Sequence, residues 1–213
     1  MLPATPNITI GAPLIELSEI DSTNIYAMSQ IEQGNANSGS CFRADFQSLG
    51  KGQHGRVWES AKGKNLLCTY ILELKTLKND KNWGPADQKG FSAAIAMGVR
   101  AFLGAFTSEI LHIKLPNDIY WNDRKAGGIL IENKLRGAEW TWSVVGIGLN
   151  INQTQFSTDA GNPVSLQQIT SKHYELAEMQ KQLSHHLGVA ITEWLQEGET
   201  NTLLKLNSYL KAK

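Results

Sequence analysis

The fold of this chain is decided by residues 110–150, which read ILHIKLPNDIYWNDRKAGGILIENKLRGAEWTWSVVGIGLN. Four segments of this stretch, 110–115, 119–121, 126–133 and 139–150, are rich in apolar and β-branched residues and are separated by short polar turns. Segments of this kind are typical of β-strands. Because connections this short join antiparallel neighbours, we predict four consecutive antiparallel strands, with Asn122-Asp123 in one of the turns.

The sequence on either side adds strands and helices in an order that does not alternate strictly. Three further strands are predicted, at residues 14–20, 39–46 and 65–74. Helices are predicted after the N-cap residues Asp21-Ser22-Thr23, after Pro85 and near the C-terminus, over residues 24–32, 86–106, 174–196 and 200–210. Residues 76–82 are predicted to form a loop, and residues 153–171 an irregular connection. Strands that cluster in the middle, with helices inserted among them, indicate an α+β fold.

The composition of the 213 residues is that of one soluble globular domain. Basic and acidic residues number 20 each, so the formal net charge is zero, and no bulk attraction to nucleic acid or to an anionic membrane is expected. The first 13 residues hold no export signal and no apolar run is long enough to span a membrane, so a cytoplasmic location is expected. Without export, Cys41 and Cys68 are predicted to be buried free thiols, and the five histidines show no metal-ligand spacing.

The glycine-rich segment Gly50–Val57, GKGQHGRV, matches G-x-G-x-x-G without the context that the known motifs need. A protein kinase is excluded because the chain has no H-R-D and no D-F-G, and a dinucleotide-binding fold because no helix follows. A P-loop is excluded because Arg56 and Val57 stand where a lysine and a hydroxyl residue are required. Converging backbone N–H groups, with Lys51 and Arg56, still favour binding of an anion. A flexible surface loop with incidental charge is the alternative.

Lys114 and Lys125 each precede apolar strand residues. Burying a lysine is costly unless an anion meets it, so the pair indicates an anion site, and a hairpin with solvated charges is the alternative. Glycines interrupt the same group of strands at Gly127-Gly128 and at Gly146 and Gly148, and the last two lie on one strand face. A bare strand face accommodates either a flat ligand or a closely packed helix, and both interpretations remain open.

Together these segments resemble the catalytic domain of biotin–protein ligases, in order over residues 15–152. Five motifs carry the resemblance: Asp21–Asn24 is similar to D-S-T-N, Gln47–Trp58 to a glutamine-led G-R-G-R-x-G-R-x-W loop, Lys114–Asp118 to K-W-P-N-D, Asp123–Leu130 to D-R-K-x-A/G-G-I-L, and Val145–Asn150 to V-x-G-x-G-x-N. The resemblance implies a mixed β-sheet flanked by helices, related to class II aminoacyl-tRNA synthetases, with residues 1–213 forming one catalytic domain.

The resemblance also implies a role for each matching residue. The catalytic residues would be Lys125, at the biotin carboxylate and then at the acyl phosphate, and Arg56 and Lys114, at the ATP phosphates. The biotin-binding residues would be Ser22, Thr23, Asn24, Gln47, Gly50, Lys51, Gly52, Gln53, Lys125, Gly128, Gly146 and Gly148. The nucleotide-binding residues would be Arg56, Trp58, Lys114, Asn117 and Asn150. Asp118 is the candidate ligand for Mg²⁺.

The implied reaction has two steps. The carboxylate of biotin attacks the α-phosphate of ATP, which releases pyrophosphate and leaves biotinyl-5′-AMP; a lysine of a biotin carboxyl carrier domain then attacks the anhydride, which releases AMP. The first step brings two anions together, so basic side chains and Mg²⁺ must offset their repulsion. The chain departs from the family at Lys51 and Gln53, which replace arginines, and at Leu115, which replaces tryptophan. The lost arginines predict weaker retention of the adenylate.

The nearest alternative is a lipoate or octanoate ligase or transferase, although K-x-P-N-D and the glycine-rich loop favour biotin. A non-catalytic relative that binds a small molecule is a second alternative, which the retained Lys125 and Arg56 disfavour. Too few residues precede the first predicted strand for a helix-turn-helix domain, so no DNA binding is expected. Some family members carry a C-terminal β-barrel, which is missing after the last predicted helix, and its absence by nature and its loss by truncation both remain open. Trp140 and Trp142, in the strand predicted near residues 139–145, favour core packing, with a homodimer through an exposed edge strand as the alternative.

Overall fold

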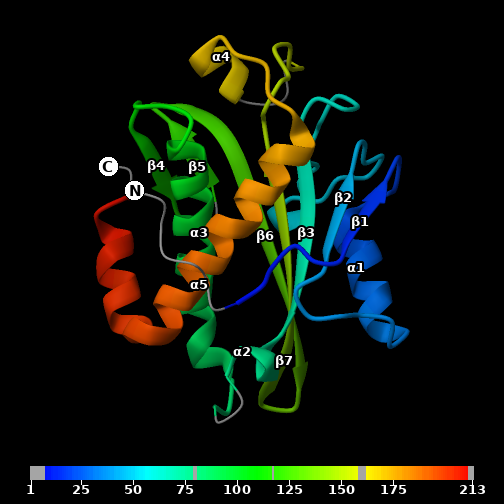
Figure 1. The fold of residues 1–213 in the computed structure, drawn as a ribbon, viewed down its shortest axis with the longest axis vertical. Helices are drawn as coiled ribbons and strands as arrows, with labels where there is room; N and C mark the ends of the chain where they lie inside the picture. The colour runs from blue at the N-terminus through cyan, green and yellow to red at the C-terminus, as the bar shows by residue number, and fades with distance from the viewer. Residues whose placement is uncertain (1–7, 79–80, 117, 158–161, 211–213) are drawn as a thin grey trace.

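The structure, a computed structural model, describes residues 8–78, 81–116, 118–157 and 162–210. Its centre is a seven-stranded sheet in the order β1-β2-β3-β7-β6-β5-β4 (Figure 1). The strands are β1 (Leu14–Leu17), β2 (Cys41–Ala44), β3 (Leu66–Glu73), β4 (Leu111–Lys114), β5 (Asp118–Trp121), β6 (Arg124–Arg136) and β7 (Glu139–Leu149). β1 pairs parallel with β2 and the other neighbours pair antiparallel, so the sheet is mixed. The four antiparallel strands predicted from residues 110–150 are confirmed as β4 to β7.

Helices flank this sheet: α1 (Thr23–Glu32), α2 (Leu74–Leu77), α3 (Gln88–Gly104), α4 (Leu166–Thr170) and α5 (Leu176–Asn207), with short 3₁₀ helices η1 (Gln53–Gly55) and η2 (Pro85–Asp87). α5 is interrupted at Gly198, whose φ is 80°, which separates the two C-terminal helices that were predicted. The loop predicted over residues 76–82 starts too early, because Thr76 and Leu77 belong to α2. A single helical turn is too short to show a periodic pattern. No helix in the described part of the chain has both the length and the apolar character needed to cross a membrane.

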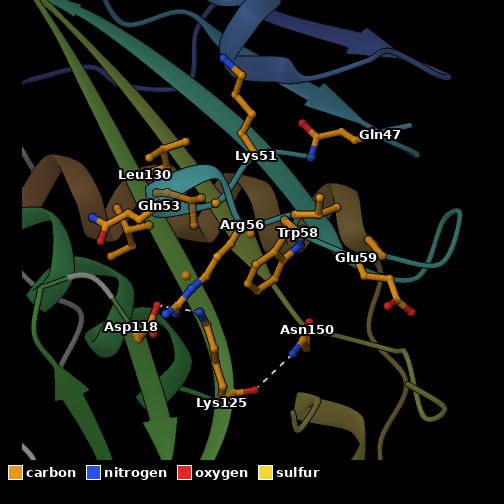
Figure 2. A pocket seen from close by; sticks show the side chains of 18 of the residues that line it. Gln47, Lys51, Gln53, Arg56, Trp58, Glu59, Asp118, Lys125, Leu130 and Asn150 are labelled. Carbon is orange, nitrogen blue, oxygen red and sulfur yellow. Dashed lines mark hydrogen bonds and ion pairs between the residues drawn. The ribbon is translucent and has the colours of Figure 1, made fainter. Parts of the chain in front are cut away.

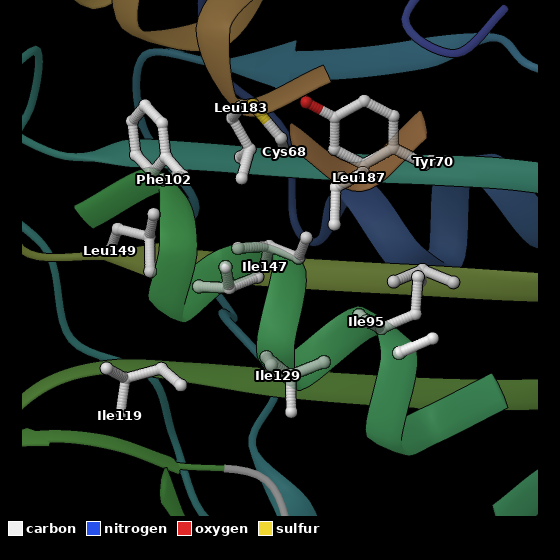
Figure 3. Packing of buried hydrophobic residues seen from close by; sticks show 14 of the residues in the cluster. Cys68, Tyr70, Ile95, Phe102, Ile119, Ile129, Ile147, Leu149, Leu183 and Leu187 are labelled. Atoms are coloured by element: carbon white, nitrogen blue, oxygen red, sulfur yellow. The ribbon is translucent and has the colours of Figure 1, made fainter. Parts of the chain in front are cut away.

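α3 and α5 cover one face of the sheet and enclose the main hydrophobic core (Figures 1 and 3). Alternate residues of β3 contribute to this core, among them Cys68 and Tyr70, while the helices supply Phe102 and Leu187. Burying one large apolar side chain stabilises the fold by roughly 1.5–3 kcal/mol. Cys41 and Cys68 are buried and free, as predicted. This helical layer supports the sheet from one side and leaves the opposite face available for a site.

α1 lies on the opposite face, against β2, β3 and β7. Its Ala27 packs with Phe42, Ile71 and Val144 in a second, smaller cluster. Tyr26 meets the Phe42 ring edge-on, with the centroids 5.3 Å apart. The N-terminal end of α1 borders a cavity that continues over β6 and the end of β7, where loops cover the sheet.

The edge strand proposed for a homodimer near residues 139–145 is not an edge. From Trp142 to Leu149, β7 pairs with β3 on one side and with β6 on the other. Glu139 and Trp140 pair with β6, and the N–H of Trp140 donates to the carbonyl of Trp83 at 3.0 Å. Trp140 is 1% exposed and meets the rings of Trp83 and Phe91, so core packing is confirmed for this residue. The turn signals around residues 137–139 mark the ends of a strand but do not identify its neighbours, so the sequence alone left the edge open.

Candidate active site

One cavity of about 1080 Å³ lies on the α1 face of the sheet (Figure 2). Its walls come from the start of α1, the segment 46–60, the turn between β4 and β5, and the adjoining parts of β6 and β7. Of the predicted site residues, it is lined by Ser22, Thr23, Asn24, Gln47, Lys51, Gly52, Gln53, Arg56, Trp58, Lys114, Asp118, Lys125, Gly128, Gly146, Gly148 and Asn150. Gly50 does not line it, and Asn117 lies outside the described residues. Residues from five motifs spread between Ser22 and Asn150 therefore meet in one place.

Gln47 caps α1 from a distant loop. The backbone N–H of Thr23 donates to Gln47 Oε1 at 2.7 Å, and the Thr23 hydroxyl donates to the same oxygen at 2.9 Å. Ser22 occupies the N-cap position with an extended backbone, but its side chain makes no capping hydrogen bond. The helix therefore begins within a residue of the predicted start, while its cap comes from a residue that local capping rules do not identify. This bond joins two of the predicted biotin-binding segments.

Asn24 uses both ends of its amide inside the protein. Its Nδ2 donates to Glu132 Oε2 at 2.8 Å and lies 3.4 Å from the carbonyl oxygen of Leu130. The hydroxyl of Thr69, on β3, lies 2.7 Å from Asn24 Oδ1. A Cβ atom added to Gly146 would stand 2.2 Å from that same Oδ1, so only glycine fits there. Close packing of a helix residue therefore explains the first of the two strand glycines.

Thr69 and Glu132 belong to this polar network, and sequence reasoning missed both. Thr69 is fully buried and lies 2.7 Å from the Thr23 hydroxyl as well as from Asn24. The available signal was a polar residue between apolar neighbours in a strand expected to be buried. That signal is weak, because an isolated threonine is common in strands of any kind.

The glycine-rich segment folds into a small hairpin. The N–H of Gly52 donates to the carbonyl of Arg56 at 2.7 Å, and the N–H of Trp58 donates to the carbonyl of Gly50 at 2.8 Å. A Cβ on Gly50 would lie 2.4 Å from the carbonyl oxygen of Trp58, which explains this glycine by close approach of two backbones. His54 and Gly55 turn the tip, with φ of 55° and 74°. The hairpin points Arg56 and Trp58 over the sheet (Figure 2).

The indole of Trp58 lies on the bare backbone of two strand glycines. A Cβ on Gly148 would stand 2.6 Å from the ring, and one on Gly128 would stand 3.1 Å from it. The ring nitrogen Nε1 is buried and has no hydrogen-bond partner. The sequence allowed either a flat ligand or a helix on this bare strand face. The structure instead places the flat ring of Trp58 against Gly128 and Gly148. This ring forms one wall of the cavity.

Basic side chains gather at the other end of the cavity. Lys125 Nζ forms an ion pair with Asp118 Oδ1 at 2.7 Å, and both side chains are largely buried. Lys114 Nζ lies 5.1 Å from the centre of the Tyr120 ring, and Arg56 is exposed. In Figure 2 the side chains of Arg56 and Lys125 both extend toward Asp118. Although the chain as a whole is neutral, this part of the cavity attracts anions.

The acidic groups of the cavity are already engaged. Its described lining holds four lysines and arginines but two carboxylates, Asp118 and Glu59, and Glu59 accepts a hydrogen bond from the Ser157 hydroxyl. Among the described residues, no group of three or more His, Cys, Asp or Glu side chains is arranged to hold a metal ion. Asp118, the candidate Mg²⁺ ligand, is paired with Lys125 instead of standing with other acids.

Cys68 also borders the cavity but does not supply a nucleophile. Burial, with the neighbouring Cys41 adding to it, raises the pKa of the Cys68 thiol well above its usual range. A buried thiol of raised pKa stays protonated and inert at neutral pH. Covalent catalysis by cysteine is therefore excluded at this position.

Solved structures of biotin protein ligases share this fold. The biotin protein ligase of Aquifex aeolicus in complex with biotin and ATP superposes with a TM-score of 0.77 over 93% of this chain and 78% of that one, at 24% identity. The Leishmania major enzyme in complex with biotinyl-5-AMP gives a TM-score of 0.77 over 94% of this chain and 82% of that one, at 20% identity. The mixed sheet flanked by helices is therefore confirmed as the fold of this class of protein.

Residues 17–150 match the sequence profile of the biotin/lipoate A/B protein ligase family, and the chain belongs to this family. The bifunctional ligase/repressor BirA of Escherichia coli is 31% identical over 192 residues, which are 88% of this chain and 56% of BirA. The biotin–[acetyl-CoA-carboxylase] ligase of Paracoccus denitrificans is 32% identical over 135 residues, which are 63% of this chain and 53% of that protein. The chain thus spans little more than half the length of these relatives.

Proposed function

We propose that this protein is a biotin–protein ligase that forms biotinyl-5′-AMP from biotin and ATP and transfers biotin to a lysine of a biotin carboxyl carrier domain. One observation carries the proposal: a single cavity has a hydrogen-bonding end at the start of α1 and a basic end at Lys125, Lys114 and Arg56. A ligand with a polar head and a carboxylate tail fits these two ends. The relative from Paracoccus denitrificans is named as a biotin ligase, and the two solved structures hold biotin with ATP or biotinyl-5-AMP, which supports this choice of acid.

Basic side chains supply what the first step needs. The biotin carboxylate and the triphosphate repel each other, and preorganised cations offset that repulsion as charge develops in the transition state. Lys125 is held ready by Asp118, at 2.7 Å, and exchanges this carboxylate for the one of biotin. Arg56 and Lys114, which border the same cavity, contact the phosphates. An arginine grips phosphate oxygens with two parallel donors, which suits the hairpin position of Arg56.

Mg²⁺ enters this scheme with ATP. The described residues provide no cluster of carboxylates for the ion, and substrate phosphates commonly share its coordination. When bound, the ion supplies charge neutralisation at the phosphates. Asp118 is the nearest candidate for a protein ligand, although its bond to Lys125 fits a positioning role better.

The hairpin at residues 50–58 keeps water from the anhydride. Its Gly52, Gln53 and Arg56 border the cavity, so the hairpin lies over the space assigned to the adenylate. Gln53 is uncharged, whereas the family's loop has arginine there. We therefore expect this chain to release more adenylate before transfer than its arginine-bearing relatives do.

The test is direct detection of the intermediate and of its transfer. Purified protein is mixed with biotin, ATP and Mg²⁺, and biotinyl-5′-AMP is sought by mass spectrometry after a single turnover. A biotin carboxyl carrier domain is then added, with a lysine-to-arginine acceptor as control. Adenylate followed by labelling of the lysine-bearing acceptor alone is expected. Adenylate of lipoate or octanoate, but not of biotin, would move the protein to the sister branch of its family, and no adenylate at all would favour a binding protein.

A further inference from the structure

Lys125 reaches the cavity because β6 contains a β-bulge. Across the β5–β6 ladder, Ile119 pairs with Gly127 but Tyr120 pairs with Lys125, which leaves Ala126 as an extra residue in β6. A bulge of this kind bends the strand and re-aims the side chains on one side of it. Ala126 itself is buried in the main core, on the side of α3.

The bulge decides which face Lys125 occupies. In a regular strand, residues an odd number apart point to opposite faces, so Lys125 would point away from Gly128 and into the core. Instead, the Cε atom of Lys125 lies 3.5 Å from a Cβ atom built on Gly128, and both residues border the cavity. A bulge also interrupts the ladder locally, so the backbone of Lys125 needs further support.

A short segment at residues 162–164 provides that support. It pairs parallel with Lys125, which donates its N–H to the carbonyl of Asn162 at 2.7 Å and accepts from the N–H of Val164 at 2.9 Å. The β6–β7 pairing ends at Gly127, and beyond it Asn150 donates its N–H to the carbonyl of Ala126 at 2.9 Å and its Nδ2 to the carbonyl of Lys125 at 3.2 Å. The segment is therefore the backbone neighbour of Lys125 where β7 has ended, and the Asn150 side chain is a second support. We call residues 162–164 the clamp segment.

Arg124 fastens the clamp segment. Its guanidinium donates twice to the carbonyl of Pro163, from Nε at 3.1 Å and from Nη2 at 2.7 Å. The side chain of Asp123 accepts from Asn162 Nδ2 at 2.9 Å. Asp123 and Arg124 of the D-R-K motif therefore bind the clamp segment through their side chains, and the clamp segment in turn binds the backbone of Lys125. Arg124 does not border the cavity, so it has no direct access to a ligand there.

We propose that Arg124 is a positioning residue for Lys125: by holding Pro163 it keeps the clamp segment on the Lys125 backbone and so keeps the bulge that aims Lys125 into the cavity. This role rests on the proposed adenylation chemistry for its effect on rate. The clamp itself is a property of the fold, which allows it to be tested separately.

The kinetic test compares Arg124→Gln with Arg124→Lys and with Arg136→Gln as the matched control. Arg136 is exposed at the far end of the same strand. Small misplacements of a catalytic group cost about 10²-fold in rate, so we expect kcat for biotin-dependent pyrophosphate exchange to fall by about 10²-fold in Arg124→Gln. Arg124→Lys should recover part of this loss, and Arg136→Gln should behave as wild type.

A double mutant separates positioning from general destabilisation. If Arg124 acts through Lys125, then Arg124→Gln added to Lys125→Ala should slow the enzyme no further than Lys125→Ala alone. An unchanged kcat in Arg124→Gln, or losses that multiply in the double mutant, would overturn the proposal.

Hydrogen exchange tests the clamp without relying on activity. The amides of Lys125 and Val164, which close the clamp, should exchange faster in Arg124→Gln, while amides in the middle of β7 keep their protection. If wild-type protein activates none of the acids tested, the proposed function fails, but this result still decides the clamp. Unchanged protection of both amides in Arg124→Gln would refute it.

Discussion

Substituting Gly148 by alanine tests whether the contact between Trp58 and the sheet shapes the site. The new Cβ would stand 2.6 Å from the indole, whereas ordinary van der Waals contact begins at 3.4 Å. The ring must therefore retreat by about 0.8 Å from the strand. Because Trp58 borders the cavity, the ring moves toward the space assigned to the ligand.

A displacement of this size has a predictable cost. Misplacing groups in an active site by about 1 Å lowers the rate by about 10²-fold, so we expect kcat/KM for biotin-dependent pyrophosphate exchange to fall by roughly that factor. Overpacking a rigid core costs about 1–3 kcal/mol, but here the cavity gives the ring room, so the loss of stability should lie at the low end of this range. Thermal unfolding measures this second quantity.

Gly104→Ala is the matched control for Gly148→Ala. Gly104 ends α3, and a Cβ there would meet nothing within 4 Å. Its activity should equal that of wild type, and its melting temperature should be unchanged or slightly higher because alanine favours helix over glycine. Wild-type exchange by Gly148→Ala would refute the reasoning that the indole wall forms part of the site.

Four further predictions concern Lys125, Gln53, Thr69 and His186. Lys125→Ala should lower adenylation by about 10²–10³-fold with an unchanged circular dichroism spectrum, and wild-type turnover would exclude its role. Gln53→Arg should slow the release of free adenylate, measured by trapping it in solution, and an equal or faster release would contradict the argument from charge. Thr69→Val should raise the KM for biotin more than it lowers kcat, because it removes a partner of Asn24 in the polar network. Burial, with His185 adding to it, lowers the pKa of His186 from 6.5, so the folded state favours the neutral ring; stability should fall as the pH drops below about 6.5, and His186→Gln should flatten the plot of melting temperature against pH.

The local parts of the fold were predictable from the sequence. The strands from residues 110–150 and α3 were visible because apolar residues and turn residues mark their bounds along the chain. Sheet order was not, because pairing joins segments far apart in sequence, as β3 with β7. For this reason the sequence left open whether the strand at Trp140 lies at an edge of the sheet. The bulge at Ala126 was hidden for the same reason, since it exists only relative to β5.

The site residues also fall into a part that the sequence predicted and a part that it did not. Residues within short motifs, such as Gln47, Arg56 and Lys125, were identified by resemblance, and the structure brings them to one cavity. Their supporting partners were not identified. Thr69 sits in an apolar strand, and the clamp segment at residues 162–164 lies in a stretch without a pattern, so their significance depends on what they contact.

The most direct test of the central claim is biotin-dependent exchange of labelled pyrophosphate into ATP, without acceptor, with octanoate and lipoate run in parallel. Exchange reports the first half-reaction alone, so it tests the proposed use of the cavity without an acceptor. We predict exchange with biotin and none with the other two acids. Exchange with octanoate or lipoate but not with biotin, or exchange with no acid, would contradict the assignment of this cavity to biotin activation.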